Sequence, residues 1–157
     1  MNVGKLAVGF IVIASLMGGA FLYYKQVHAY YQPVAFQPGN EIRLTPVVSG
    51  TPEPILAEDV TGIDGDSSPI RFRACFTTPM SLAMLSETYR SYDRAEPLNA
   101  PGWFDCFDAP RIGAALESGE ALAFLSEANI HPGVDRVVAV FGDGRAYAWH
   151  QLSDGGL

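Results

Sequence analysis

The sequence predicts an α+β fold, with an N-terminal transmembrane helix followed by a small domain that has a mainly antiparallel sheet and two helices. Three observations support this prediction. An uncharged apolar run at residues 6–24 precedes all seventeen acidic residues. Residues 69–77 and 136–152 have the alternation and turn signals of strands. Residues 78–91 and 108–119 each combine a capping residue, a proline and apolar residues at helical spacing.

The apolar run is long enough to cross a membrane. As a helix, its residues 6–24 extend about 28 Å, which matches the hydrocarbon core of a bilayer. A cleaved secretory signal is the alternative, because Gly18 and Ala20 are small residues of the kind that a signal peptidase reads. The run continues past that position, so we expect an uncleaved anchor at residues 1–25, with the N-terminus in the cytoplasm and the rest exported.

Small residues share one face of this helix. Ala14 and Gly18 are four residues apart, and so are Ser15 and Gly19, which allows a second transmembrane helix to approach closely. Glycine and alanine are also common in membrane spans without such a role. If the face is used, the protein packs beside other membrane-protein subunits.

The remainder divides into a linker and one acidic domain. Prolines at positions 33 and 38 indicate a linker over residues 26–40. Residues 41–157 contain eight basic and seventeen acidic side chains, a net charge of −9. Such a surface repels nucleic acid, so we expect no nucleic-acid partner. A chain of 157 residues allows one modest core.

Short strands are expected in the first half of the domain. The segment "EIRLTPVV" reads as a strand that Pro46 confines to a sheet edge, and residues 51–63 read as a turn followed by an extended segment. In residues 69–77 the two faces of a strand alternate, with Ile70, Phe72, Ala74 and Phe76 on one face and Arg71, Arg73 and Cys75 on the other.

Two helices follow from capping signals. Thr78 before Pro79 predicts a helix start, with Leu82, Leu85 and Tyr89 forming the buried stripe, Met84 beside them, and an end near residue 91. Asp108 predicts the cap of a second helix, with Pro110 near its start, Ile112 and Leu116 facing inward, and Gly119 as its end. Residues 120–127 are then expected to form a strand.

The last segment predicts a hairpin. In "RVVAVFGDGRAYAWHQL", Asp143 and Gly144 are expected to form a tight turn with positive φ. That turn would place Val138, Val140, Tyr147 and Trp149 on one face, and Val137, Phe141, Ala146 and His150 on the other. Both faces are largely apolar, so we expect the hairpin to be central in its sheet or covered on each side.

The two cysteines, Cys75 and Cys106, admit three interpretations. A thiol nucleophile needs a base, for which His131 and His150 are the candidates in the domain. A zinc site needs about four ligands at characteristic spacing, which two isolated cysteines do not provide. Export favours the third, a Cys75–Cys106 disulfide, with Trp103, Phe104 and Phe107 packed around it.

Other chemical motifs are weak or missing. The segment "DGDSS", residues 64–68, resembles the start of a calcium loop, but Pro69 and Cys75 occupy the positions of its glycine and glutamate. The sequence has no nucleophile elbow, phosphate-binding glycine loop or H-E-x-x-H motif. We therefore identify no catalytic, cofactor or metal residues, and an enzyme is possible but unsupported.

Three segments, "SSPIRFRACFTT", "AEPLNAPGWFDCFDAPRIGAALESGEALAFL" and "DRVVAV" with "WHQ", resemble an uncharacterised family of small alphaproteobacterial proteins with one N-terminal membrane span. The resemblance implies a bacterial, membrane-anchored protein, and it carries no catalytic residues over. Combined with the expected orientation of the anchor, it predicts a single-pass protein of the bacterial inner membrane with a periplasmic C-terminal domain. We hypothesise an accessory or assembly subunit that docks on a larger membrane complex. The alternative is an extracytoplasmic sensing or ligand-binding domain that signals through a partner, and a redox or hydrolytic enzyme is the third class.

Overall fold

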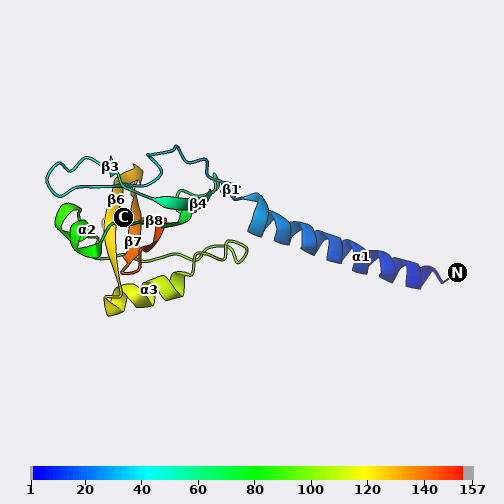
Figure 1. Cartoon of the computed structure of the whole chain (residues 1–157). Coiled ribbons are helices and arrows are strands. Elements are labelled where there is room, and N and C mark those ends of the chain that lie inside the picture. Colours follow the sequence, from blue (N-terminus) through cyan, green and yellow to red (C-terminus); the bar gives the residue numbers. More distant parts are fainter. Residues whose placement is uncertain (1, 154–157) are drawn as a thin grey trace.

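The computed structural model describes residues 2–153 and has the predicted α+β architecture. A long N-terminal helix projects from a domain built on a six-stranded antiparallel sheet (Figure 1). Met1 and residues 154–157, the outer ends of the predicted anchor and domain, lie outside the described residues.

The helices and strands follow one another in a simple order. They are α1 (Val3–Tyr24), the π-helical turn η1 (Lys25–Ala29), β1 (Gln32–Pro33), β2 (Arg43–Leu44), β3 (Glu53–Pro54), β4 (Glu58–Asp64), β5 (Arg73–Thr77), α2 (Leu82–Thr88), α3 (Ala109–Ser118), β6 (Ala121–His131), β7 (Val134–Phe141) and β8 (Arg145–Leu152).

Helix α1 makes up most of the arm that projects from the domain. Its 22 residues extend about 33 Å, and none of them is buried. Together with η1 it forms a helix, Val3–Ala29, that is the one helix among residues 2–153 long and apolar enough to cross a membrane. The helix thus continues into the predicted 26–40 linker, and β1 in that linker pairs with β4.

The main sheet has the strand order β1-β4-β5-β8-β7-β6, and every neighbouring pair is antiparallel. Strands β7 and β8 therefore lie inside the sheet, as the apolar hairpin predicted. A first hydrophobic cluster covers one face and includes Phe72, Phe76, Val138 and Val140. A second cluster covers the other face.

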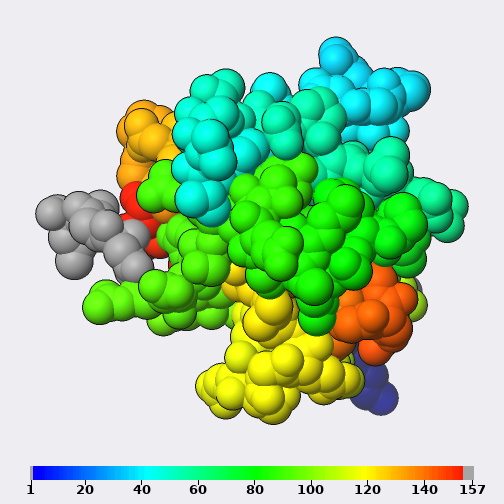
Figure 2. Space-filling model, turned by 60° about the vertical axis from the view of Figure 1, so that its left-hand side comes forward, coloured from blue at the N-terminus to red at the C-terminus, as the bar shows by residue number. Residues whose placement is uncertain are grey.

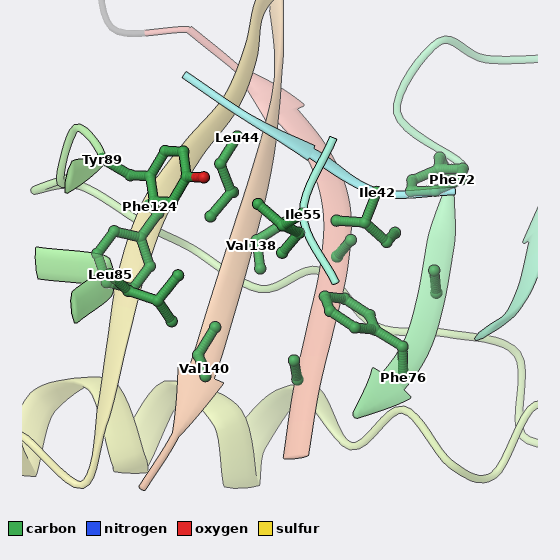
Figure 3. Packing of buried hydrophobic residues seen from close by; sticks show 13 residues of the cluster. Ile42, Leu44, Ile55, Phe72, Phe76, Leu85, Tyr89, Phe124, Val138 and Val140 are labelled. Atoms are coloured by element: carbon green, nitrogen blue, oxygen red, sulfur yellow. The ribbon is translucent and has the colours of Figure 1, made fainter. Parts of the chain in front are cut away.

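The first cluster is closed by the segments between α1 and β5 and by α2. Ile42, Leu44 and Ile55, from the small β2–β3 sheet and its flank, point toward the side chains of the main sheet (Figure 3). Leu85 of α2 and Tyr89 complete it from the other end. The second cluster lies under α3, where Ile112 and Ala115 contact the far face of β7 and β8.

Strand β5 has the predicted alternation, but both of its faces are buried. Phe72 and Phe76 belong to the first cluster and Cys75 to the second. Arg73, expected on a polar face, is only 4% exposed. The sheet is covered on both sides here, so this side chain is enclosed between β5 and the segment before α3.

The predicted faces of the β7–β8 hairpin are wrong by one residue. Val138 pairs with Ala148, and Val137 pairs with Trp149. Val138, Val140 and Ala146 therefore share the first cluster, and Trp149 lies on the opposite face. The cause is a three-residue loop, 142–144, in place of the expected two-residue turn. Of the two expected turn residues only Gly144 has positive φ, at +95°, and such a loop shifts the register by one.

Replacing Gly144 with alanine is expected to destabilise the protein by about 1–2 kcal/mol. A Cβ atom there would lie 2.7 Å from the Thr78 carbonyl oxygen, in addition to the strain of the positive φ. Gly142→Ala is the matched control, since its Cβ would meet only Leu82 Cδ1, at 3.9 Å. Urea denaturation of both variants tests this, and equal stability would contradict the turn geometry.

The first domain helix begins later than predicted. Ser81, whose hydroxyl accepts a hydrogen bond from the Met84 amide, is its cap in place of Thr78. The Thr78 hydroxyl instead accepts from the Met80 amide and stabilises the turn that precedes the helix. Met84 is 50% exposed, while Leu85 and Tyr89 are buried as expected.

The second helix and the strand after it agree with the sequence. Asp108 caps α3 by accepting from the Arg111 amide, and Gly119 ends the helix with φ +80°. Ile112 is buried and Leu116 half-buried. Strand β6 begins at Ala121 and runs to His131, four residues beyond the predicted strand.

Candidate functional site

The structure joins the two cysteines in a disulfide between β5 and the loop that precedes α3. Their Cα atoms lie 6.4 Å apart, and the bond spans 31 positions of the sequence. Cys75 is buried, whereas Cys106 lies at the surface. His150 points to the other face of the sheet, where it stacks on Phe72. The candidate base His150 therefore does not face the sulfur atoms.

The buried side chain of Arg73 forms hydrogen bonds with the same segment before α3. Its Nε donates to the Leu98 carbonyl at 2.9 Å and its Nη2 to the Asn99 carbonyl at 3.1 Å. Its Nη1 donates to the carbonyls of Ile70 and Phe72, both at 2.7 Å. Burial lowers the pKa of this guanidinium to about 10, so it is charged at neutral pH. Four carbonyl dipoles hold the cation, with no carboxylate in direct contact among the described residues.

Replacing Arg73 with methionine is expected to destabilise the protein by roughly 2–3 kcal/mol, because four backbone carbonyls, that of Phe72 in a buried hydrogen bond, lose a charged donor. Arg73→Lys keeps the charge but not the planar fork that serves several acceptors at once, so it is expected to recover only part of that stability. Urea denaturation of the full chain in detergent provides the measurement. A variant as stable as the wild type would show that water replaces the guanidinium.

Trp103 contacts the end of the apolar helix and is not packed around the disulfide as expected. Its Nε1–H donates to the Val27 carbonyl at 2.7 Å. Its ring stacks on His28 with centroids 5.6 Å apart, and His28 stacks in turn on Tyr24 at the same separation. Phe107, by contrast, is buried near the disulfide against Tyr147 and Trp149 as predicted. The disulfide-bonded loop therefore connects the domain core to the helix.

His150 is a buried neutral imidazole. Its Nδ1 lies 2.8 Å from the Pro69 carbonyl, and its Nε2 accepts from Arg136 Nε at 3.0 Å. Burial and the positive charge of Arg136 lower the pKa of His150 to about 3. Both ring nitrogens have protein partners, so the side chain serves packing, as the sequence interpretation favoured over a catalytic base.

No group of three or more potential metal-ligating side chains occurs in the part of the chain that the structure describes. In the candidate calcium loop, Asp64 accepts from the amide of Gly65. That turn packs closely against the backbone of Tyr30. The acidic turn thus contributes to the junction between helix and domain.

An open groove of about 960 Å³ runs along the edge of the sheet beside β6. Residues 89–97 form one wall, α3 forms the other, and Ala121–Phe124 of β6 lie at its base. Figure 2 shows this face, where the green α2 segment borders the yellow α3 and β6. The wall is fixed to β6 by hydrogen bonds from the Tyr92 amide to Ala123 and from the Leu125 amide to Arg90.

The lining of the groove is partly apolar and partly acidic. Leu116 and Leu122 contribute apolar surface, and Leu122 is 37% exposed. Asp93, Glu96 and Glu117 supply carboxylates, against the single cation Arg90 among the lining residues. The sequence did not predict this groove, because its walls come from segments that only the folded sheet brings together.

The small residues of α1 remain open to other molecules. The Ser15 hydroxyl donates to the Ile11 carbonyl at 2.8 Å, so its polar group is satisfied inside the helix. Nothing lies within 4 Å of a Cβ built on Gly18 or Gly19. Ala14, like these three residues, is exposed, and none of the four has a partner element within the described chain.

Residues 42–157 match the family of unknown function DUF6446. No curated protein and no solved structure matches the chain. The match covers the domain and begins after α1.

Proposed function

Because the chain belongs to a family of unknown function, DUF6446, we propose a role from its own residues: a membrane-anchored accessory or assembly subunit that acts by protein–protein interaction with a larger membrane complex. The observation that carries this proposal is the unpartnered helix α1. All of its described residues are exposed or nearly so, and they are almost entirely apolar. A bilayer satisfies that surface, and a neighbouring helix fits its small-residue face.

The proposed location is the bacterial inner membrane, with the N-terminus in the cytoplasm and the domain in the periplasm. The Cys75–Cys106 disulfide supports export, since such bonds persist in oxidising compartments. In intact cells, a membrane-impermeant maleimide applied after reduction is expected to label Cys106, which lies at the surface. Labelling that requires cell lysis would contradict this orientation.

A binding role fits the side chains better than catalysis does. The sulfur atoms are bonded to each other, and the nitrogen atoms of His150 are held by Pro69 and Arg136. The groove beside β6 offers apolar side chains and carboxylates to a partner segment. We therefore assign the domain to docking, with α1 as both anchor and contact.

Replacing Gly18 and Gly19 together with leucine is expected to reduce recovery of the partner about tenfold, equivalent to about 1.4 kcal/mol of association free energy. A Cβ added at either position meets no other part of this chain within 4 Å, so the substitutions are expected to act on contacts with other molecules. The tagged full chain is extracted in mild detergent, and stoichiometric membrane proteins are quantified by mass spectrometry.

Gly9→Leu is the matched control for this experiment. A Cβ on Gly9 also meets nothing within 4 Å. Gly9 precedes Gly18 by nine residues, so it lies on about the opposite side of the helix. Partner recovery is expected to survive this substitution. A wild-type chain that purifies alone, or equal losses in both variants, would refute the proposed helix contact.

The groove also favours a second candidate function, an extracytoplasmic sensing or ligand-binding domain that signals through a partner. Its volume of about 960 Å³ is in the range of small-molecule sites. Native mass spectrometry of the gently extracted protein separates the two functions. A bound small molecule that Leu122→Arg removes supports the sensor, and a protein partner with an empty groove supports the subunit.

A further inference from the structure

Three aromatic side chains and one arginine gather where the domain meets the end of the apolar helix. We define the membrane-proximal patch as Tyr30, Tyr31, Arg71 and Trp103. Tyr30 is 44% exposed and Trp103 is 39% exposed. In Figure 1 the yellow-green loop that contains Trp103 extends from the domain toward the end of α1. The hydrogen bond from Trp103 to the Val27 carbonyl fixes that position.

The length of the helix sets the depth of this patch relative to a bilayer. The uncharged run of residues 6–24 covers about 28 Å, close to the thickness of the hydrocarbon core. Val27 follows Tyr24 by three residues, or about 4.5 Å along the helix. The headgroup layer extends roughly 5–7 Å beyond the core on each side. A group bonded to Val27 therefore lies within this layer.

The side chains of the patch match the chemistry of that layer. Tryptophan and tyrosine place apolar rings and polar edges at the membrane–water boundary. Tyr24, His28 and Trp103 form one continuous stack that crosses the predicted boundary. The disulfide and Arg73 hold the Trp103 loop against the domain, so the stack is supported from the protein side.

Arg71 supplies a cation without an anionic protein partner. Its guanidinium carbon lies 5.5 Å from the Tyr30 ring centroid and 5.1 Å from that of Tyr31. Its Nε is buried without a hydrogen-bond partner. No ion pair to Arg71 occurs among the residues that the structure describes. Arginine binds phosphate oxygens through several donors at once, which makes a phosphodiester a fitting ligand.

We propose that the membrane-proximal patch binds the lipid headgroup layer around α1, with Trp103 and the two tyrosines at the boundary and Arg71 on a lipid phosphate. This rests on the proposed membrane anchor and adds a second contact with the membrane. The domain then sits directly on the bilayer in a fixed orientation. An acidic domain with a net charge of −9 would otherwise be held away from anionic lipids.

Tryptophan fluorescence tests the depth of the patch, because the chain has two tryptophans and Trp149 is 0% exposed. The full-length Trp149→Phe variant, with Trp103 as its only tryptophan, is reconstituted in phosphatidylcholine–phosphatidylglycerol vesicles. Lipids with a nitroxide at the headgroup are expected to quench its emission more strongly than lipids labelled at the chain end. Dissolved iodide is expected to quench it weakly.

Two controls make the result decisive. Trp103→Phe retains only the buried Trp149 and is expected to respond to neither quencher. If Trp149→Phe does not fold, the difference between wild type and Trp103→Phe reports the same residue. Strong quenching of Trp103 by iodide, with none by lipid labels, would overturn the proposal. Alkaline carbonate extraction reports insertion of α1 separately, so failure of the anchor is distinguished from failure of the patch.

Solid-state NMR tests the role of Arg71. All eight arginines are labelled with carbon-13 at the guanidinium carbon. Lipid phosphorus is expected to dephase the guanidinium signal of only a minority of them. Arg71→Gln is expected to abolish that dephasing. Arg145→Gln is the matched control and is expected to retain the dephasing, because Arg145 lies opposite Thr77 at the other end of β5 and is paired with Asp143. Dephasing that persists in Arg71→Gln would refute the phosphate contact.

Discussion

Replacing Cys75 and Cys106 together with alanine is expected to lower the free energy of unfolding by roughly 3 to 4 kcal/mol. A bond that closes a loop across 31 positions removes much of the conformational freedom of the unfolded chain. A loss of this size is a large share of the stability of a small domain. Urea denaturation of the full chain in detergent micelles, followed by far-UV circular dichroism, measures it.

Reduction provides the matched control for this substitution. A thiol-free reductant is expected to destabilise the wild-type protein by a similar amount and to leave the double-alanine variant unchanged. Trp103 supplies a local readout, because its hydrogen bond to Val27 depends on the disulfide-bonded loop. A double variant as stable as the wild type would show that Arg73 alone holds that loop.

The sequence predicted the elements that local chemistry determines. Asp108 and Gly119 define α3 because each satisfies backbone groups within one turn of the helix end. The alternation of β5 assigned Phe72 and Cys75 to opposite faces correctly. The apolar length of α1 required no tertiary information. In each case a few neighbouring residues decide the structure.

The errors arose where a distant segment or a single extra residue decides the structure. The β7–β8 register depends on whether the loop has two or three residues, and "GDG" is compatible with both. Arg73 looked like a surface residue because an alternating pattern does not reveal that both faces of the strand are covered. The sequence pointed to Thr78 as the helix cap, whereas the cap is Ser81. Both residues precede suitable helical residues, so the local pattern does not distinguish them.

The candidate sites were the least predictable features. Trp103 and Val27 are 76 positions apart, and no local pattern connects them. The groove likewise requires α3 and residues 89–97 to lie on either side of β6. The contact of Arg71 with the rings of Tyr30 and Tyr31 also joins residues that are about 40 positions apart. The pairing of β1 with β4 brings these segments together, and no local pattern in the sequence indicates it.

Stability is expected to fall as the pH decreases from about 6.5 to 3, and His150 is expected to be a main cause. Its pKa is about 3 in the folded protein, against an ordinary value of 6.5. Between these values the unfolded chain binds a proton that the folded protein does not, so acid favours unfolding. The loss is on the order of 4 kcal/mol across this window, and the full stability is present above pH 6.5.

His150→Gln isolates this effect from the titration of carboxylates, which is common to both proteins. Glutamine does not titrate, and it can donate to the Pro69 carbonyl and accept from Arg136 as the imidazole does. Its unfolding free energy is expected to change less with pH than that of the wild type. His131→Gln is the control, because His131 is exposed and its ring lies 5.6 Å from that of His150. Parallel pH profiles for wild type and His150→Gln would show that the folded protein protonates His150, which its contacts with Arg136 and Pro69 oppose.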